Sequence, residues 1–216
     1  MVFSSAKTHM IGAEKALAGR DYYEFTVPDT HHVTGRPIKP PFPEGLAQIV
    51  LGMGCFWGSE EIFWQVPGVY TTAVGYAGGF TSHPWYEEVC SGLTGHTEAV
   101  LVVYDPAVVS LHDLLVIFFE HHDPTQGYRQ GNDVGTQYRS AIYWTSPDQR
   151  AEVEQATAEY SEHLQRLSFA AATTELAPLR EFFYAEDYHQ QYLAKNPNGY
   201  RCHATTGVKF PAPAGS

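Results

Sequence analysis

The residue with the clearest chemical potential is Cys55, in the run Gly-Cys-Phe-Trp-Gly at 54–58. An apolar strand pattern ends just before it and a helical pattern follows, so we expect the cysteine at the first turn of a helix. Unpaired N–H groups and the helix dipole favour a thiolate there. Phe56 and Trp57 would form an apolar wall for a small neutral group. The alternative is a structural cysteine buried in a tight turn, as free cysteines usually are.

A carboxylate stands at the start of another apolar run. Glu98 lies in Gly-His-Thr-Glu-Ala-Val at 95–100. A glutamate that enters the core is either salt-bridged or a carboxylic acid with a raised pKa, and the latter can donate a proton at neutral pH. A solvated strand end is the other interpretation of the same pattern.

The long polar segment 126–140 contains three glycines, two tyrosines, two arginines and Asp133. Loops of this length and composition often carry function. Tyr86 and Tyr138 could each direct a hydroxyl into a pocket, although any one of fourteen tyrosines is weak evidence alone.

Two histidine pairs raise the question of a metal site. His31-His32 and His121-His122 are adjacent in sequence, so their side chains point to different faces. No Cys-x-x-Cys or His-x-x-x-His spacing accompanies them, and we therefore expect no metal.

The elements that would position these residues follow from hydrophobic periodicity. We predict a two-layer α/β (α+β) sandwich with a mixed β-sheet, flanking helices and a ferredoxin-like core, although strand order cannot be read from the pattern. The predicted strands are 47–53, 69–76, 99–104, 140–144, 173–176 and 181–184, and the predicted helices are 59–65, 111–121, 147–167 and 187–193.

Three regions divide the chain of 216 residues. We predict that residues 1–45 form an irregular, extended arm rich in proline. Residues 46–196 should form a catalytic α/β domain, and residues 197–216 a C-terminal tail that carries Cys202. We expect the tail to be irregular and mobile.

Composition narrows the class of protein. Thirteen Lys and Arg against 24 Asp and Glu give a net charge of −11, which argues against nucleic acid and anionic membranes as partners. The first residues lack the apolar core of a signal peptide, so we expect a cytoplasmic protein. Three cysteines do not make a disulfide framework, and in a cytosolic chain they are buried or reactive thiols.

From about residue 49 to 200 the chain closely resembles peptide methionine sulfoxide reductases of the A class, which reverse methionine oxidation. The motifs that carry this resemblance are Gly-Cys-Phe-Trp-Gly at 54–58, Val-Gly-Tyr-Ala-Gly-Gly at 74–79, Tyr-Glu-Glu-Val-Cys-Ser-Gly at 86–92, Gly-His-Thr-Glu-Ala-Val at 95–100, His-Asp-Pro-Thr-Gln-Gly at 122–127, Gly-Asn-Asp-Val-Gly-Thr-Gln-Tyr-Arg-Ser-Ala-Ile-Tyr at 131–143 and Tyr-His-Gln-Gln-Tyr-Leu at 188–193.

The resemblance implies a role for each candidate residue. Cys55 would attack the sulfoxide sulfur and become a sulfenic acid. Glu98 would protonate the sulfoxide oxygen, which the hydroxyls of Tyr86 and Tyr138 would hold.

The remaining roles concern the substrate and the recycling of the enzyme. Phe56 and Trp57 would cradle the S-methyl group, and Asp133 would help to position water and form the polar rim. Cys202 would condense with the sulfenic acid to a disulfide, which thioredoxin or another thiol reductant then reduces. The resemblance implies no metal or organic cofactor and the S epimer of the sulfoxide as substrate, free or within proteins. We also expect a monomer.

The tail departs from the family pattern. Members commonly carry a cysteine directly after Gly-Tyr and a second one after Thr-Gly-Val, and an ungapped alignment places Arg201 and Phe210 at those positions. Cys202 lies one residue further on. Cys90 belongs to a segment that we expect to be a buried strand, which favours Cys202 as the resolving thiol.

Two other classes of function remain open from the residues alone. A thiol hydrolase or transferase would pair Cys55 with a histidine such as His189 as base. A peptide-binding module would keep the aromatic pocket without catalysis.

Overall fold

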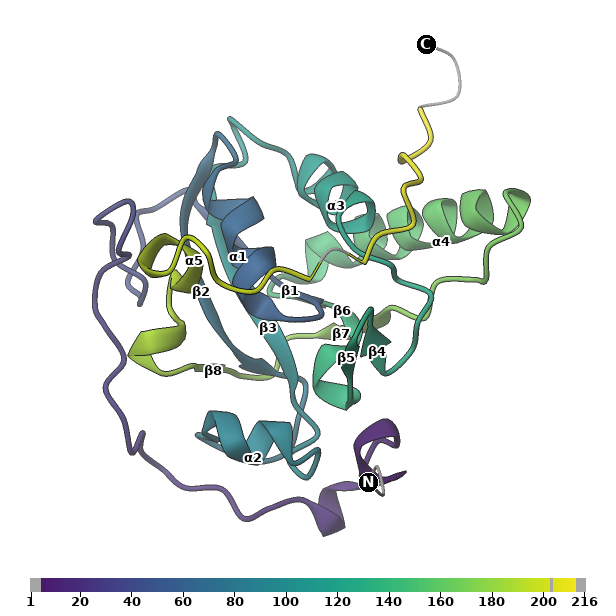
Figure 1. The fold of residues 1–216 in the computed structure, drawn as a ribbon. Coiled ribbons are helices and arrows are strands. Elements are labelled where there is room, and N and C mark those ends of the chain that lie inside the picture. Colours follow the sequence, from purple (N-terminus) through teal and green to yellow (C-terminus); the bar gives the residue numbers. More distant parts are fainter. Residues whose placement is uncertain (1–4, 203, 213–216) are drawn as a thin grey trace.

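The computed structural model describes residues 5–202 and 204–212, and its centre is a six-stranded sheet (Figure 1). The strand order is β7-β6-β1-β3-β2-β8, and every neighbouring pair is antiparallel except β6 and β7, so the sheet is mixed. The strands are β1 (Ala47–Met53), β2 (Val69–Ala77), β3 (Thr97–Tyr104), β6 (Ser140–Trp144), β7 (Glu175–Pro178) and β8 (Phe182–Tyr184), with β4 (Arg129–Gln130) and β5 (Asp133–Val134) as a separate pair.

Helices pack on one face of this sheet. Alternate residues of β1, such as Ile49 and Leu51, point into a core that also contains Phe63, Phe118 and Tyr160 from three different helices. The α-helices are α1 (Phe56–Trp64), α2 (Tyr86–Cys90), α3 (Leu111–Glu120), α4 (Arg150–Arg166) and α5 (Tyr192–Lys195), and short 3₁₀ turns occupy Ser5–Thr8, Ala13–Lys15, Thr136–Tyr138, Pro147–Gln149 and Asp187–His189. None of the helices in 5–202 and 204–212 has the length and apolar character needed to cross a membrane.

The N-terminal arm covers the opposite face. Val50 of β1 points there and joins a second core with Ile38 of the arm, which is fully buried. Figure 1 shows the arm running past α2 on its way to β1. A bidentate contact between Arg20 and Glu88 of α2, at 2.7 and 2.9 Å, fastens it there. The arm is irregular, as expected, and contributes to the core.

Most predicted elements agree with the structure, and the differences concern turns. The helix expected from Ser59 begins at Phe56, because the chain turns directly at Gly54. The helix expected over 187–193 is two short pieces, because Gln191 adopts a left-handed conformation (φ 47°) that interrupts it. The expectation of a buried strand around Cys90 is wrong: Cys90 ends helix α2 and is half-buried.

The C-terminal tail has no regular structure over 196–202 and 204–212, but it is attached to the domain. In Figure 1 it crosses α1 and then passes α3 and α4. Phe210 stacks on Tyr160 of α4, with 5.6 Å between ring centroids. Side-chain contacts thus hold this stretch against the domain although it has no regular secondary structure, and its mobility stays a prediction.

Candidate active site

A sharp turn after β1 presents Cys55 at the N-cap of α1. Gly54 makes this turn with a φ of +87°, a conformation that glycine adopts at little cost. A Cβ at Gly54 would also lie 2.6 Å from the side chain of Gln130, so there is no room for a larger residue. The thiol itself is 9 % exposed and free.

Glu98 enters the same space from β3, the strand next to β1. Its Oε2 accepts a hydrogen bond from the backbone N–H of Phe56 at 3.1 Å, which ties the carboxyl to the residue after the cysteine. Burial, opposed by this hydrogen bond and aided by the charges of Asp133 and Glu186, raises the pKa of Glu98 to about 8. Of the three interpretations of its position, the carboxylic acid with a raised pKa agrees with the structure, and it carries a proton at neutral pH.

The expectation of a thiolate at Cys55 is not met in this structure. Burial, followed by the charge of Glu98, raises the pKa of Cys55 well above its ordinary value. The helix N-terminus cannot offset these effects, because the cysteine is removed from water and faces a carboxyl group. The unliganded site therefore contains a thiol beside a carboxylic acid.

Two tyrosines flank this pair from different elements. Tyr86 begins α2, and Tyr138 ends the 3₁₀ turn within the polar loop. Burial and then the proximity of Glu98 raise the pKa of both hydroxyls, so both remain protonated donors. The hydroxyl of Tyr86 donates to the thiol of Cys90.

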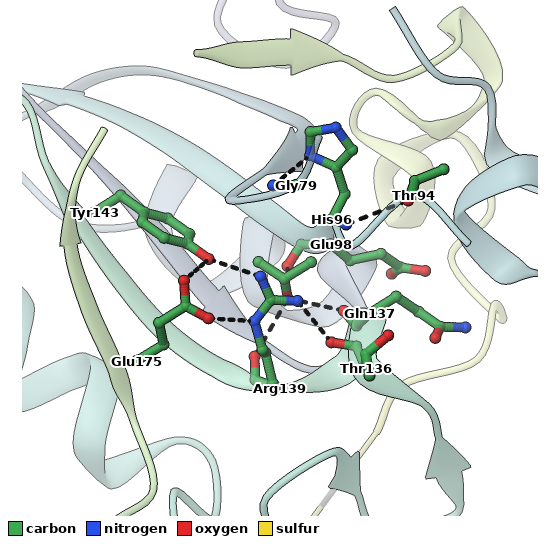
Figure 2. Close-up of polar contacts among 10 residues, drawn as sticks. Gly79, Thr94, His96, Glu98, Thr136, Gln137, Arg139, Tyr143 and Glu175 are labelled. Atoms are coloured by element: carbon green, nitrogen blue, oxygen red, sulfur yellow. Dashed lines mark hydrogen bonds and ion pairs between the residues drawn. The ribbon is translucent and has the colours of Figure 1, made fainter. Parts of the chain in front are cut away.

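A buried ion pair holds the loop that carries Tyr138. Arg139 is 3 % exposed and pairs with Glu175 of β7 at 2.6 Å, and it also donates to the hydroxyl of Tyr143 at 3.0 Å and to the carbonyl of Thr136 at 2.9 Å. Figure 2 shows this network, with Glu98 close to the loop. The loop is thereby fixed to β6 and β7 directly after Tyr138.

The two aromatic residues after Cys55 pack together with a histidine. Phe56 is buried against His189, with 5.1 Å between ring centroids. The indole N–H of Trp57 donates to Nδ1 of His189 at 2.9 Å, and its ring stacks on Tyr192 at 3.9 Å. Burial lowers the pKa of His189 to about 3. Because Nδ1 of His189 is occupied by the indole and its pKa is about 3, His189 is a poor base for Cys55, which argues against the hydrolase hypothesis with this histidine.

Cys202 and Asp133 lie on the other side of Cys55. Cys202 lines one pocket with Cys55, of about 150 Å³, and its thiol donates to the carbonyl of Gln130 at 3.5 Å. Asp133 accepts from the hydroxyl of Tyr200 at 3.2 Å. Cys202 thus reaches the pocket of Cys55 from the tail, whereas the other six predicted site residues do not line this pocket.

Sequence reasoning missed a buried carboxylate behind the site. Glu60 of α1 is fully buried and accepts from the hydroxyl of Thr72 at 2.9 Å and from the backbone and side chain of Gln191 at 2.8 and 2.6 Å. Burial raises its pKa to about 7. The spacing of Phe56, Glu60 and Phe63 by four and three places Glu60 on the inward helix face, and this signal could have revealed it.

Within residues 5–202 and 204–212, no three His, Cys, Asp or Glu side chains converge in a way that could hold a metal ion. The two histidine pairs serve the fold instead. His31 contacts Thr72 at 3.0 Å, and His122 contacts Ser140 at 2.7 Å.

Known proteins share both the sequence and this arrangement. The family model described as peptide methionine sulfoxide reductase matches residues 47–212. Proteins named peptide methionine sulfoxide reductase MsrA from Agrobacterium fabrum and Brucella anthropi are 59 % and 58 % identical, over 94 % and 96 % of this chain and 94 % of each relative. The structure of methionine sulfoxide reductase A of Corynebacterium diphtheriae matches with a TM-score of 0.85 and 45 % identity, covering 94 % of this chain and all of that one. With its whole catalytic region matched and the buried cysteine and carboxyl group together, the chain belongs to the peptide methionine sulfoxide reductase family.

Proposed function

We propose that this enzyme reduces methionine S-sulfoxide, free or in proteins, with Cys55 as nucleophile and Glu98 as proton donor. The observation that carries this assignment is the carboxyl group of Glu98, protonated at neutral pH and hydrogen-bonded to the residue after Cys55. The thiol attacks the sulfoxide sulfur while Glu98 supplies a proton to the oxygen. In sum, the oxygen passes from methionine to Cys55, which becomes a sulfenic acid, and methionine is released.

The chirality of the reaction follows from three fixed directions at the sulfur atom. The wall of Phe56 and Trp57 accepts the methyl group, the carboxyl of Glu98 and the hydroxyls of Tyr86 and Tyr138 hold the oxygen, and Cys55 approaches along the third direction. Such a site accepts one epimer, and membership of the A class makes it the S epimer. Asp133 contributes to the polar rim, where its contact with Tyr200 leaves it half-buried.

The recycling step that we propose uses Cys202. Its thiol replaces the hydroxyl of the sulfenic acid, so that a Cys55–Cys202 disulfide and water form. Thioredoxin or another thiol reductant of the cytoplasm then reduces this disulfide. The shared pocket of the two cysteines supports this order of events.

The fold supports the same assignment. We propose that the core is ferredoxin-like, a βαββαβ unit made of β1, α1, β2, β3, α3 and β6. The antiparallel order β6-β1-β3-β2 supports it. This order makes β1 and β3 neighbours, so that Cys55 after β1 lies near Glu98 in β3.

The test follows NADPH consumption by thioredoxin reductase, thioredoxin and this protein on addition of each sulfoxide epimer. We expect turnover with the S epimer and none with Cys55→Ser, because a serine hydroxyl is a much weaker nucleophile towards sulfur than a cysteine thiol. Cys202→Ser should release one equivalent of methionine and then stop. Equal consumption of both epimers, or a Cys55→Ser variant with a tenth of the wild-type rate, would refute the proposal.

A further inference from the structure

Arg201, the residue just before Cys202, is bound tightly at the position where family members commonly carry a cysteine. Its guanidinium donates to both carboxylate oxygens of Glu61, each at 2.7 Å. It also donates to the carbonyls of Pro197 and Gly199, at 2.9 and 3.3 Å. One side chain thus closes the loop that leads to Cys202 and fastens it to α1.

The tail is also held beyond Cys202. The carbonyl of Val208 accepts from the hydroxyl of Tyr160 at 2.9 Å, and the N–H of Phe210 donates to Glu120 at 2.8 Å. Phe210 occupies the other position at which the family commonly has a cysteine, and its ring packs on Tyr160. Cys202 therefore lies between two anchors.

The upstream anchor connects Cys202 to the helix of the nucleophile itself. Cys55 is the N-cap of α1, and Glu61 belongs to the same helix. Any motion that separates Arg201 from Glu61 therefore moves Cys202 relative to Cys55. By contrast, the contacts of the Cys202 thiol itself are weak: it donates to the carbonyl of Gln130 at 3.5 Å and has a hydrogen bond with the side chain of Tyr200.

We propose that the ion pair between Arg201 and Glu61 positions Cys202 for attack on the sulfenic acid of Cys55, and so sets the rate of disulfide formation. The inference rests on the proposed recycling step. In that step the Cys202 sulfur bonds to the Cys55 sulfur, the S–O bond breaks, and the hydroxyl leaves as water with the thiol proton of Cys202. Arg201 and Glu61 touch no reacting atom.

The size of the effect follows from the length of chain that the ion pair restrains. Without it, the upstream chain keeps only the single hydrogen bond from the Tyr200 hydroxyl to Asp133, at 3.2 Å, before the firm attachment in α5, which ends at Lys195. The effective concentration of a tethered group falls roughly as the −3/2 power of tether length, and the downstream anchor limits the loss, so disulfide formation should slow about tenfold. Both partners are partly exposed, so the pair should weaken as salt screens it.

The experiment mixes reduced enzyme with one equivalent of S-sulfoxide and follows two quantities in single turnover. Methionine release reports the attack by Cys55, and trapping of the sulfenic acid with dimedone reports its lifetime. We expect Glu61→Gln and Arg201→Gln to release methionine at the wild-type rate and to retain the sulfenic acid about ten times longer. Glu154→Gln, which breaks an exposed ion pair with Arg150 on α4, is the matched control and should change neither quantity.

A variant in which the charges at positions 61 and 201 are exchanged distinguishes a loss of positioning of Cys202 from a general loss of structure. The double variant Glu61→Arg with Arg201→Glu should restore most of the disulfide rate, and high salt should slow wild type but not Glu61→Gln. A wild-type sulfenic acid lifetime in Glu61→Gln, or no rescue by the exchange, overturns the inference. Disulfide formation in Cys202→Ser, or no methionine release by wild type, would instead overturn the proposed function itself.

Discussion

At the scale of single residues, the site holds a protonated thiol beside a protonated carboxyl group, whereas a glutamate in water would be ionised at pH 7. Burial raises the pKa of both Cys55 and Glu98, so each stays neutral at pH 7. A pair of neutral groups is cheaper to bury than a thiolate beside a carboxylate. Charge then develops only during the reaction, where the hydroxyls of Tyr86 and Tyr138 can stabilise it.

Glu98→Gln tests the proton donor. The amide keeps the shape of the side chain but cannot protonate the oxygen, so the single-turnover rate should fall about a hundredfold or more, with little change in sulfoxide binding. Because the donor is the protonated form, the wild-type rate should also fall as pH rises through about 8, and Glu98→Gln should not show this fall. Glu87→Gln, at an exposed position on α2, is the control. An unchanged rate in Glu98→Gln would reduce Glu98 to a structural role.

At the scale of elements, the turn between β1 and α1 decides where the cysteine stands. Gly54→Ala should destabilise the fold by about 1–3 kcal/mol from its left-handed backbone alone. The added contact with Gln130 should displace Cys55 and slow the chemical step by about a hundredfold, as for a misplacement of about 1 Å. Denaturant unfolding and single-turnover rates measure the two effects.

The matched control for this substitution is Gly58→Ala in α1. A Cβ there meets no atom within 4 Å, and the helix interior favours alanine by about 1 kcal/mol. Gly58→Ala should therefore stabilise the protein. Equal stability of the two alanine variants would mean that the turn at Gly54 is not constrained.

The strands could be predicted from sequence better than the turns. The short apolar runs that form β1 and β6 predicted the observed bounds, because burial on both faces leaves a continuous apolar signal. The five-residue helix α2 was missed because so short an element has little periodicity. The break at Gln191 could not be foreseen, since it depends on hydrogen bonds to Glu60, far away in sequence.

The site residues were foreseen to the extent that they lie in local motifs. Cys55 and Glu98 each stand at the end of a recognisable strand. The partners of Arg201 and His189 could not be predicted, because Glu61 and Trp57 reach them only through the fold.

At the scale of the whole molecule, the arm acts as the second layer that a half-covered sheet requires. Ile38→Ala removes a fully buried side chain from that layer and should cost about 2–4 kcal/mol of unfolding free energy. Val33→Ala, at an arm position that is 49 % exposed, should change stability by less than about 0.5 kcal/mol. Denaturant midpoints compare the two, and equal effects would show that the arm adds nothing to the core.

The raised pKa of Cys55 has a consequence beyond catalysis. Hydrogen peroxide, a common cause of methionine oxidation, attacks thiolates and largely spares protonated thiols. An enzyme that works amid this oxidant is best protected if its own sulfur is unreactive until a sulfoxide fills the pocket. Burial of Cys55 beside Glu98 raises the pKa of its thiol, so we expect peroxide to oxidise the resting enzyme slowly.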